Sequence, residues 1–277
     1  MSRSKNGGLM TLSSSDANRA RSIPLFQNLS DKCLSMLLKS ASLRCFPARI
    51  ILFNERTRAK FLYTLLRGSV ELFSERHDRR STIAIVRSIR PILLTSIFDN
   101  INPLSACTLE RSELLSVPLK VVHELIDSDV SFARAITYEL ARDLSKTMED
   151  FKNDRLRTSI ERLAAWVLRS DKDAGATGRF VIPCGKRVLA SQLGMTAENL
   201  SRGFASLAAH GVAVHGRQVS VSDRTALAER ACVGDVAPVY EDAPPLAHWQ
   251  PDGRKRAYSH LETKRASKKA HPALASD

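Results

Sequence analysis

Residues 187–207 decide the fold, and they read Arg187-Val-Leu-Ala-Ser-Gln-Leu-Gly-Met-Thr-Ala-Glu-Asn-Leu-Ser-Arg-Gly-Phe-Ala-Ser-Leu207. Apolar residues recur at helical spacing on both sides of Gly194: Leu189, Ala190 and Leu193 before it, and Leu200, Phe204 and Leu207 after it. Gly194 stands where the chain must turn sharply, because glycine adopts positive φ at little cost. Thr196 is placed to cap the second helix. A helix, a glycine-bearing turn and a capped helix together predict a helix-turn-helix.

The second predicted helix carries polar side chains away from its apolar face: Glu198, Asn199, Ser201, Arg202 and Ser206. Such side chains suit base edges in a major groove, since glutamate accepts from cytosine N4 and arginine donates to guanine N7 and O6. We therefore predict that these residues, together with Thr196 at the start of the helix, contact DNA.

The residues after this helix predict a wing. Residues 211–221 read Gly-Val-Ala-Val-His-Gly-Arg-Gln-Val-Ser-Val, which is two β-prone segments around a glycine turn. Arg217 lies near the tip of that turn, and we expect it to reach a phosphate. Residues 155–223 contain 10 Lys and Arg against 5 Asp and Glu, a balance that favours a polyanionic partner for this segment.

The composition of the whole chain limits the classes of protein it can belong to. Its 277 residues carry a formal net charge of +13, which favours nucleic acid or an acidic membrane surface as partner. The five cysteines show no C-x-x-C spacing, so we expect reduced thiols in a cytoplasmic protein rather than a disulfide framework or a zinc site. No apolar run approaches the roughly 18 residues of a membrane span, so we expect no membrane-embedded segment.

The N-terminal half predicts a different kind of domain. Residues 1–22 read as a polar, disordered tail, and residues 30–41 as a helix with Ser30 as its N-cap. The pattern then changes to short segments rich in β-branched and aromatic residues, which cover residues 50–53, 61–66, 69–73, 82–86 and 114–117. Short strands at a spacing of about ten residues indicate an antiparallel barrel or roll, which we place within residues 23–126.

Residues 127–153 predict one long helix without proline or glycine. Its apolar residues recur every three or four positions: Phe132, Ile136, Leu140, Leu144, Met148 and Phe151. A helix of this length extends beyond a small domain and suits pairing with a second copy of itself, so we predict a dimerisation helix. Packing of the stripe on the chain's own barrel is the alternative interpretation. Residues 154–223 complete the predicted DNA-binding domain, and residues 224–277 are expected to form a disordered basic tail.

The order of a β-roll, a long helix and a winged helix-turn-helix resembles the Crp/Fnr family of bacterial transcription regulators, and the resemblance covers residues 23–223. Its most specific element is Glu198-Asn-Leu-Ser201-Arg202, which fits the Glu-x-x-Ser-Arg signature of the Fnr-like branch. Leu66-Arg-Gly68-Ser-Val-Glu-Leu is similar to the family's glycine turn within the roll.

The resemblance implies both the fold and the mode of action. The fold is α+β, with a cyclic-nucleotide-binding-like antiparallel roll, a dimerisation helix and a C-terminal winged helix-turn-helix. The function is that of a transcription regulator that binds double-stranded DNA as a homodimer on a two-fold symmetric site, with RNA polymerase as a further partner. The half-site resembles TTGAT, and Glu198, Ser201 and Arg202 make the base contacts.

The sensor half lacks two ligand sites found in relatives. In members that bind cyclic nucleotides, a Gly-Glu pair and, about ten residues later, an Arg-Ser or Arg-Thr pair hold the cyclic phosphate. The matching stretch, residues 90–107, has Leu94-Thr95 and Leu104-Ser105 at these positions, with no glycine and no basic residue after Arg90. A phosphate there would lack charge neutralisation, so we expect no cAMP. We expect no iron–sulfur cluster either, because no cysteine precedes Cys33.

The same stretch is rich in large apolar residues: Ile92, Leu93, Leu94, Ile97 and Phe98. Our hypothesis is that they line a pocket for a small apolar effector or a haem. A filled core without a ligand is the alternative.

Three other residues invite a functional interpretation. Cys184 precedes the predicted DNA-binding helices by a few residues, and its thiol would be a redox switch if lysines such as Lys186 lowered its pKa. A structural thiol is the alternative. His77 is expected to be exposed in a hairpin turn, and His123 is expected to be either a structural residue or a ligand.

Two further function classes remain. An enzyme is not expected, because the sequence has no phosphate loop, no G-x-S-x-G, no H-E-x-x-H and no His, Cys and Asp grouping at metal spacing. The alternative to DNA-binding regulation is a basic interaction or membrane-surface protein, which would use the C-terminal tail and have a helical domain that does not bind DNA.

Overall fold

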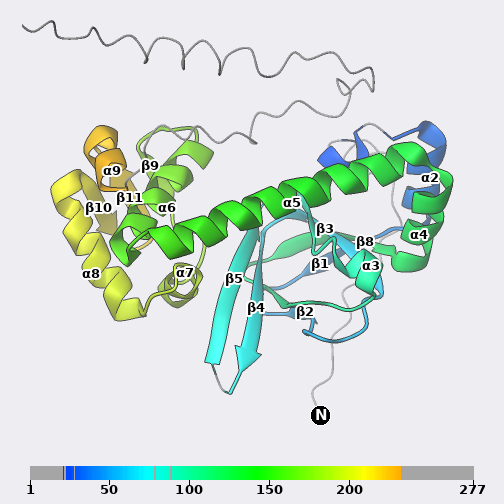
Figure 1. The fold of residues 1–277 in the computed structure, drawn as a ribbon, viewed down its shortest axis with the longest axis horizontal. Helices are drawn as coiled ribbons and strands as arrows, with labels where there is room; N and C mark the ends of the chain where they lie inside the picture. The colour runs from blue at the N-terminus through cyan, green and yellow to red at the C-terminus, as the bar shows by residue number, and fades with distance from the viewer. Residues whose placement is uncertain (1–20, 22, 28, 78, 88, 232–277) are drawn as a thin grey trace, which may run out of the picture. The chain divides into compact units, whose positions relative to one another are not determined.

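The structure is a computed structural model, and it describes residues 21, 23–27, 29–77, 79–87 and 89–231. Most of the two predicted tails lies outside the described residues. Figure 1 shows a β-rich N-terminal part, the long helix α5, and a C-terminal part built mainly of helices. Among the described residues, no helix has both the length and the apolar character needed to cross a bilayer.

Two four-stranded antiparallel sheets form the roll, which confirms the predicted architecture. The first has the order β1-β8-β3-β6 and consists of Ser42–Phe46, Ser112–Pro118, Phe61–Arg67 and Arg90–Ile92. The second has the order β2-β7-β4-β5 and consists of Ile51–Phe53, Ser105–Thr108, Ser69–Arg76 and Arg79–Arg87. Every predicted strand segment is a strand, whereas β1, β6 and β7 lie outside the predicted segments.

Gly68 joins β3 to β4 and explains why the turn needs glycine. Its φ is +96°, and a Cβ atom there would meet the backbone oxygen of Arg111 at 2.8 Å. Any other residue would therefore strain the backbone and collide with the turn that precedes β8.

Helices cover the outer face of the first sheet. They are η1 (Pro24–Phe26), α2 (Asp31–Ser40), α3 (Ser96–Asp99), α4 (Leu119–Ser128) and the start of α5 (Val130–Leu156). Ser30 caps α2 as predicted, since its hydroxyl accepts from the Cys33 amide at 3.1 Å. Apolar side chains of these helices and of the sheet form one core, in which Phe26, Leu37 and Phe132 are completely buried.

The long helix differs from its predicted bounds. The chain bends at Asp129, so that α4 ends at Ser128 and α5 begins at Val130. The Asp129 carboxylate accepts from the Phe132 amide at 3.1 Å and caps α5. At its other end α5 continues to Leu156, three residues beyond the predicted limit.

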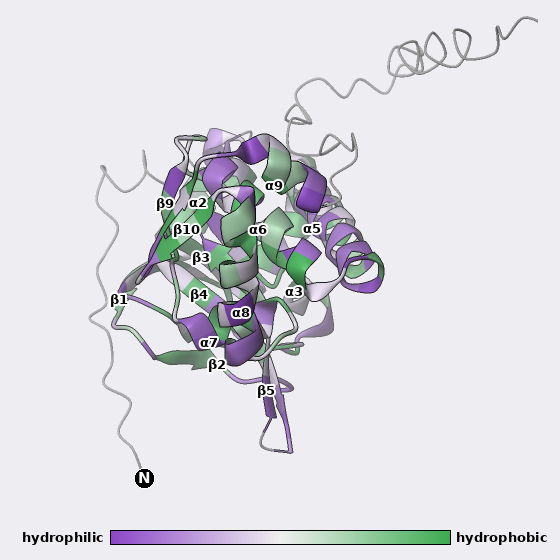
Figure 2. Cartoon of the chain, turned by 90° about the vertical axis from the view of Figure 1, so that its left-hand side faces the viewer, coloured by the Kyte–Doolittle hydropathy of each residue, from purple (hydrophilic) through white to green (hydrophobic). Residues whose placement is uncertain are grey.

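The C-terminal part combines helices with a small sheet. Its helices are α6 (Ser159–Asp173), α7 (Lys186–Gln192), α8 (Ala197–Leu207), η2 (Ala208–His210) and α9 (Arg224–Arg230). The sheet has the order β10-β11-β9 and consists of Val212–His215, Gln218–Val221 and Arg179–Val181. Figure 2 turns this part toward the viewer, with α6, α7 and α8 in front.

The disordered tail was predicted to start at residue 224, but residues Arg224–Arg230 form helix α9. Leu227 and Ala231 are completely buried in the core of this domain. Arg224 of the same helix donates from Nε to the buried Asp171 carboxylate of α6 at 2.7 Å. The ordered chain therefore extends to at least residue 231.

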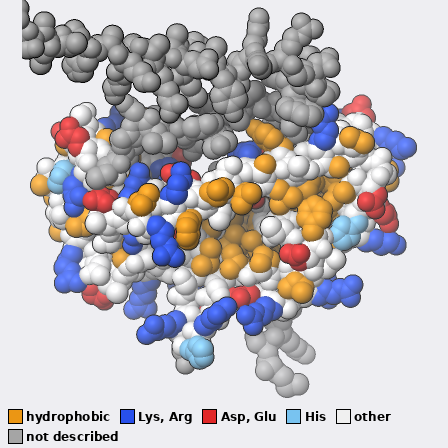
Figure 3. Space-filling view, in the orientation of Figure 1, with side chains coloured by type: hydrophobic (Ala, Val, Ile, Leu, Met, Phe, Trp, Pro, Cys, Tyr) orange, Lys and Arg blue, Asp and Glu red, His pale blue; other side chains and the backbone are white. Residues whose placement is uncertain are grey.

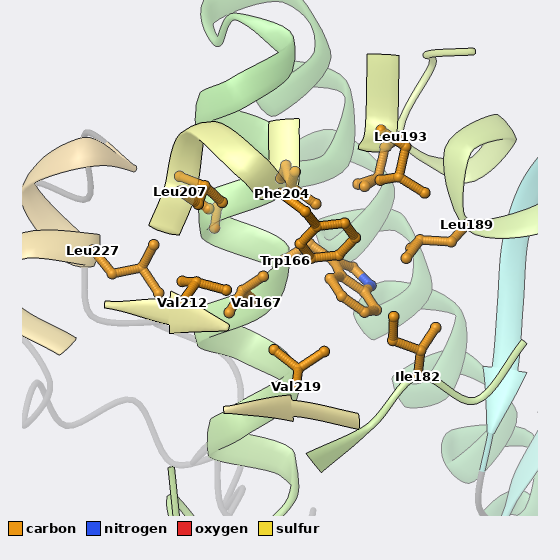
Figure 4. Packing of buried hydrophobic residues seen from close by; sticks show 14 of the residues in the cluster. Trp166, Val167, Ile182, Leu189, Leu193, Phe204, Leu207, Val212, Val219 and Leu227 are labelled. Carbon is orange, nitrogen blue, oxygen red and sulfur yellow. The ribbon is translucent and has the colours of Figure 1, made fainter. Parts of the chain in front are cut away.

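Figure 4 shows the core that holds the C-terminal helices in place. Trp166 of α6 lies at its centre, and its ring meets that of Phe180 edge-on, with centroids 5.8 Å apart. Side chains from α6, α7, α8 and the sheet converge on this pair, so the positions of α7 and α8 are fixed by packing rather than by the turn alone.

Candidate nucleic-acid interface

The predicted helix-turn-helix is present as α7, a turn and α8. Gly194 lies in the turn with a φ of +64°. The Thr196 hydroxyl accepts from the Asn199 amide at 3.2 Å, which caps α8 as predicted. Gly194 and Thr196 therefore have the turn conformation and the capping role predicted from the sequence.

One face of α8 packs closely against α6. Leu200 and Leu207 are completely buried on this face. Gly203 lies between them, and a Cβ atom there would meet Leu163 Cδ2 of α6 at 2.8 Å. The small residue thus allows α8 to approach α6 closely, and the opposite face of α8 is turned to solvent.

The solvent-facing side of α8 carries all five predicted base-contacting side chains, and each of them is exposed: Glu198, Asn199, Ser201, Arg202 and Ser206. The Arg202 guanidinium donates to Asn199 Oδ1 at 2.5 Å, and the Ser201 hydroxyl donates to the Ala197 carbonyl at 3.0 Å. These bonds lie along the helix surface, so the polar groups form one continuous face about two turns long. We name the five residues the α8 polar face.

Glu198 is held in its charged form. Hydrogen bonding from its own backbone amide and from the Thr196 side chain, helped by the charges of Arg202 and Arg187, lowers the pKa of its carboxyl group. An ionised carboxylate is an acceptor only, which is what the exocyclic amine of cytosine requires.

Arg187 was missed among the predicted site residues. It is exposed at the start of α7, and its charge reaches Glu198 on α8. The signal was the pair Lys186-Arg187 directly before the first apolar residues of the helix-turn-helix. Basic side chains at this position flank the α8 polar face and suit phosphate contacts.

The predicted wing is also present, and Arg217 makes a hydrogen bond that the sequence did not indicate. Gly216 forms the turn between β10 and β11 with a φ of +64°. The Arg217 Nε donates to the Ile182 carbonyl at 2.7 Å, so this part of its guanidinium ties the wing to the end of β9. The other two guanidinium nitrogens are the groups that would make its predicted contact with a phosphate.

The apolar stripe of α5 divides into two halves, which corrects the predicted dimerisation set. Phe132 and Ile136 are at most 1% exposed and belong to the core of their own roll, with Leu140 packed beside them. Leu144, Met148 and Phe151 are 60–62% exposed. Figure 3 shows hydrophobic side chains gathered along α5 and the strands beside it. Only the second half of the stripe is therefore free to meet a partner.

The predicted sensor-pocket residues do not surround a common cavity. Leu94 and Ile97 pack in the core that faces the helices, whereas Ile92 packs between the two sheets. Leu93 is half-buried beside Ile92, and Phe98 is 57% exposed. The five side chains thus point to three different places, and the alternative interpretation, a filled core, describes Ile92, Leu94 and Ile97 better.

The imidazole beside this segment is engaged with its backbone. His123 is the imidazole that contacts this segment, and its Nε2 lies 2.6 Å from the Ile97 carbonyl, so the ring serves to hold α3. Among the described residues, no group of three or more His, Cys, Asp or Glu side chains is placed to bind a metal ion.

The structure contradicts the redox hypothesis for Cys184. The residue is 4% exposed, and burial raises the pKa of its thiol to about 11 despite the nearby charges of Arg87 and Arg217. A buried thiol that remains protonated is a poor nucleophile. His77, by contrast, is exposed next to the tip of the β4–β5 hairpin as expected.

Family models match both parts of the chain. The model of the Crp-like helix-turn-helix domain matches residues 161–230, and that of the cyclic nucleotide-binding domain matches residues 43–129. The chain belongs to the Crp/Fnr family. Members of this family are helix-turn-helix transcription regulators that bind DNA. The comparison with curated proteins gives no match.

Solved structures of Crp/Fnr proteins share the fold. FixK2 from Bradyrhizobium japonicum is 22% identical, with a TM-score of 0.63 over 68% of this chain and 96% of that chain. The c-di-GMP-responsive regulator CLP from Xanthomonas campestris is 19% identical, with a TM-score of 0.59 over 69% and 99% of the two chains. A Crp/Fnr regulator from Eubacterium rectale is 16% identical, with a TM-score of 0.62 over 76% and 98%.

Proposed function

We propose that this Crp/Fnr regulator binds a two-fold symmetric DNA site as a homodimer and inserts α8 into the major groove of each half-site. The observation that carries the proposal is the α8 polar face, whose five side chains are exposed while the opposite face of the same helix is buried. An ionised Glu198 offers an acceptor, and Arg202, one helical turn later, offers a donor. The two side chains suit neighbouring base pairs, one of which presents a donor and the other acceptors in the major groove.

Mobility-shift titrations with an inverted repeat of TTGAT test the proposal. Arg202→Ala should weaken binding by about 1–3 kcal/mol and relax the preference at one base position in each half-site. Arg179→Ala is the matched control, because Arg179 is an exposed arginine on β9 of the same domain and lies off α8. It should leave the base preference unchanged. Equal losses for Arg202→Ala on the repeat and on random DNA would contradict base reading.

The exposed half of the α5 stripe supports the homodimer. Leu144, Met148 and Phe151 follow one another at four- and three-residue spacing, as in the seam of a paired helix. Three large apolar side chains left in solvent on one helix face favour a partner of the same kind, since a two-fold axis places the same stripe opposite itself.

The roll of this chain is proposed not to bind cyclic nucleotides. Leu94 takes the position of the family's phosphate-binding pair and is 1% exposed, and Leu104 takes that of the basic residue. A small apolar effector or a haem, the two ligand classes expected from the sequence, would have to displace Leu94 or Ile97 from the core. Titration calorimetry with cAMP and cGMP should give no heat of binding, and saturable binding of either nucleotide would overturn the proposal.

A basic interaction or membrane-surface protein is the alternative function. Binding through a charged tail alone collapses for all DNA sequences alike as salt rises, whereas sequence-selective binding survives moderate salt. Titrations of the TTGAT repeat and of random DNA at two salt concentrations therefore separate the two functions. Phosphatidylserine vesicles in place of DNA test the membrane surface directly.

A further inference from the structure

The β4–β5 hairpin carries a basic tip that the proposed function does not use. Strands β4 and β5 remain paired out to Arg76 and Arg79, three residue pairs beyond Phe73 and Thr82. Figures 1 and 2 both show this end of the hairpin extending beyond the rest of the roll, and Figure 2 shows it as hydrophilic. No apolar core lies at the tip to explain why the strands extend so far.

The middle of the hairpin is fixed against the first helix of the helix-turn-helix. The Thr82 amide donates to the Ser191 hydroxyl of α7 at 2.8 Å, and the Thr82 hydroxyl donates to Glu71 at 2.6 Å. Ile85 of β5 and Leu109, just after β7, pack against the core of the DNA-binding domain. The hairpin is thus held at a set distance from α7 and α8.

Two of the three arginines at the tip have no ion-pair partner among the described residues. Arg80 is occupied, because it contacts Glu71 at 2.6 Å and Glu75 at 3.4 Å and lies over the Phe73 ring. Arg76 and Arg79 have no ion-pair partner among the described residues. Asp78, which lies outside them, is the one acidic residue between Arg76 and Arg80, against three arginines.

The tip is also hollowed. A depression of about 390 Å³ is lined by two arginines, a histidine and two serines: Ser74, Arg76, His77, Arg79 and Ser81. The Ser74 hydroxyl donates to Glu55 at 2.6 Å and is therefore already occupied. Figure 3 shows Lys and Arg side chains gathered at the lower edge of the molecule, where this hairpin lies. Arg76 and Arg79 are both exposed donors, so this tip suits an anion with several acceptor oxygens.

The tip of the hairpin lies within one turn of B-DNA of the N-terminus of α8. Thr82 lies three residues along β5 from Arg79, a distance of about 10 Å. Five residues lead from Ser191 to the α8 cap Thr196, at most about 17 Å. With the hydrogen bond that joins the two segments, the path is shorter than one turn of B-DNA, about 34 Å.

From this geometry we propose that the β4–β5 tip binds a backbone phosphate of the DNA flanking each half-site, through Arg76 and Arg79. The proposal rests on the DNA binding proposed above and adds a contact outside the sequence that α8 reads. Such a contact strengthens binding without reading sequence.

Two duplexes test the proposal with the full-length protein. One ends at the outer edge of each half-site, and the other extends about 10 base pairs further on each side, one turn of the helix. The double variant Arg76→Ala/Arg79→Ala should bind the short duplex as the unaltered protein does and bind the long duplex more weakly. On the long duplex, the slope of the logarithm of its binding constant against the logarithm of the salt concentration should be smaller in magnitude by about two. The ratio of the two proteins' affinities for this duplex should therefore shrink about tenfold between 50 and 200 mM salt.

Matched controls separate this contact from other causes. Lys32→Ala/Lys39→Ala removes the same charge from exposed positions of α2, which contacts α4 and β8, and should leave both duplexes unaffected. Thermal unfolding should show that the tip variant is folded. Equal weakening on both duplexes, or none on the long one, would overturn the proposal. Arg202→Ala must still weaken both duplexes; if it weakens neither, the DNA-binding proposal itself has failed.

A free phosphate is the other source of the same chemistry. Titration calorimetry of the unaltered protein without DNA should detect no saturable binding of inorganic phosphate that the tip variant loses. Such binding, together with equal affinity of the two proteins for the long duplex, would assign the depression to a free phosphate compound and overturn its assignment to DNA.

Discussion

Leu144→Ala should weaken self-association of the protein. Complete burial of a leucine side chain is worth about 1.5–3 kcal/mol, and Leu144 is 62% exposed in the single chain, so covering the rest is worth about 1–2 kcal/mol. A two-fold symmetric pair contains two copies, so the dimer should lose about 2–4 kcal/mol. That loss corresponds to a rise of about thirtyfold to a thousandfold in the dissociation constant.

Sedimentation equilibrium over a range of protein concentrations measures this constant. Lys146→Ala is the matched control. Lys146 is two residues from Leu144 and therefore lies on the other side of α5. There it pairs with Asp150 at 3.2 Å. It should leave the constant unchanged. A Leu144→Ala protein that associates as tightly as the original, or equal weakening by Lys146→Ala, would refute the assignment of the exposed stripe to a dimer seam.

Two further predictions concern the DNA-binding domain. Gly203→Ala places a methyl group 2.8 Å from Leu163 Cδ2, so the free energy of unfolding measured in urea should fall by about 1–3 kcal/mol. Adding Leu163→Ala to the same chain should recover part of that loss. Full stability of the single variant would contradict the close approach of α8 to α6. Burial raises the pKa of the Cys184 thiol from 9.0 to about 11. As the pH rises, the thiol therefore ionises in the unfolded chain before it ionises in the folded chain. The free energy of unfolding should fall by up to about 2 kcal/mol between pH 9 and pH 11. Urea titrations at both pH values should show a smaller fall for Cys184→Ala, and an unchanged pH dependence in this variant would exclude Cys184 as a source.

The helix-turn-helix could be predicted in detail because its signals are local. Gly194 and Thr196 act within a few residues of themselves, through a positive φ and a capping hydrogen bond. The same holds for Ser30 at the start of α2 and for Gly68 between β3 and β4. At each position the required conformation or bond depends on the nearest turn, so the sequence pattern alone was sufficient.

Other elements depend on contacts that are distant in the sequence. Strand β1 contains Arg44 and Cys45 among its five residues and shows no clear alternation, and it is a strand because it pairs with β8, some 70 residues away. The break before α5 is similar, since Asp129 receives a hydrogen bond at 2.9 Å from Ser30, which is 99 residues distant. Helix α9 is ordered by Leu227 in the core and by the Arg224–Asp171 pair, neither of which a short polar segment reveals.

The candidate site shows the same division between local and distant causes. Helical periodicity placed the α8 polar face correctly, because one buried face fixes the opposite one. Periodicity also found the whole stripe of α5, but it could not tell which part the chain itself covers. Phe132 and Phe151 occupy equivalent positions in the pattern, and they differ only in whether a sheet of the same chain lies against them.

That divided stripe gives the roll a physical route to the DNA-binding domain without a cyclic-nucleotide pocket. Leu94 and Ile97, in the stretch where relatives hold the cyclic phosphate, belong to the same core as Phe132 and Ile136 of α5. Because protein interiors are close-packed, a change of volume at Leu94 or Ile97 must be accommodated by the side chains around them, including those of α5. Helix α5 runs without interruption for 27 residues to the exposed stripe and ends two residues before α6, the helix against which α8 packs. A signal that repacks this core would therefore act on the proposed dimer seam and on the support of the α8 polar face through one continuous element.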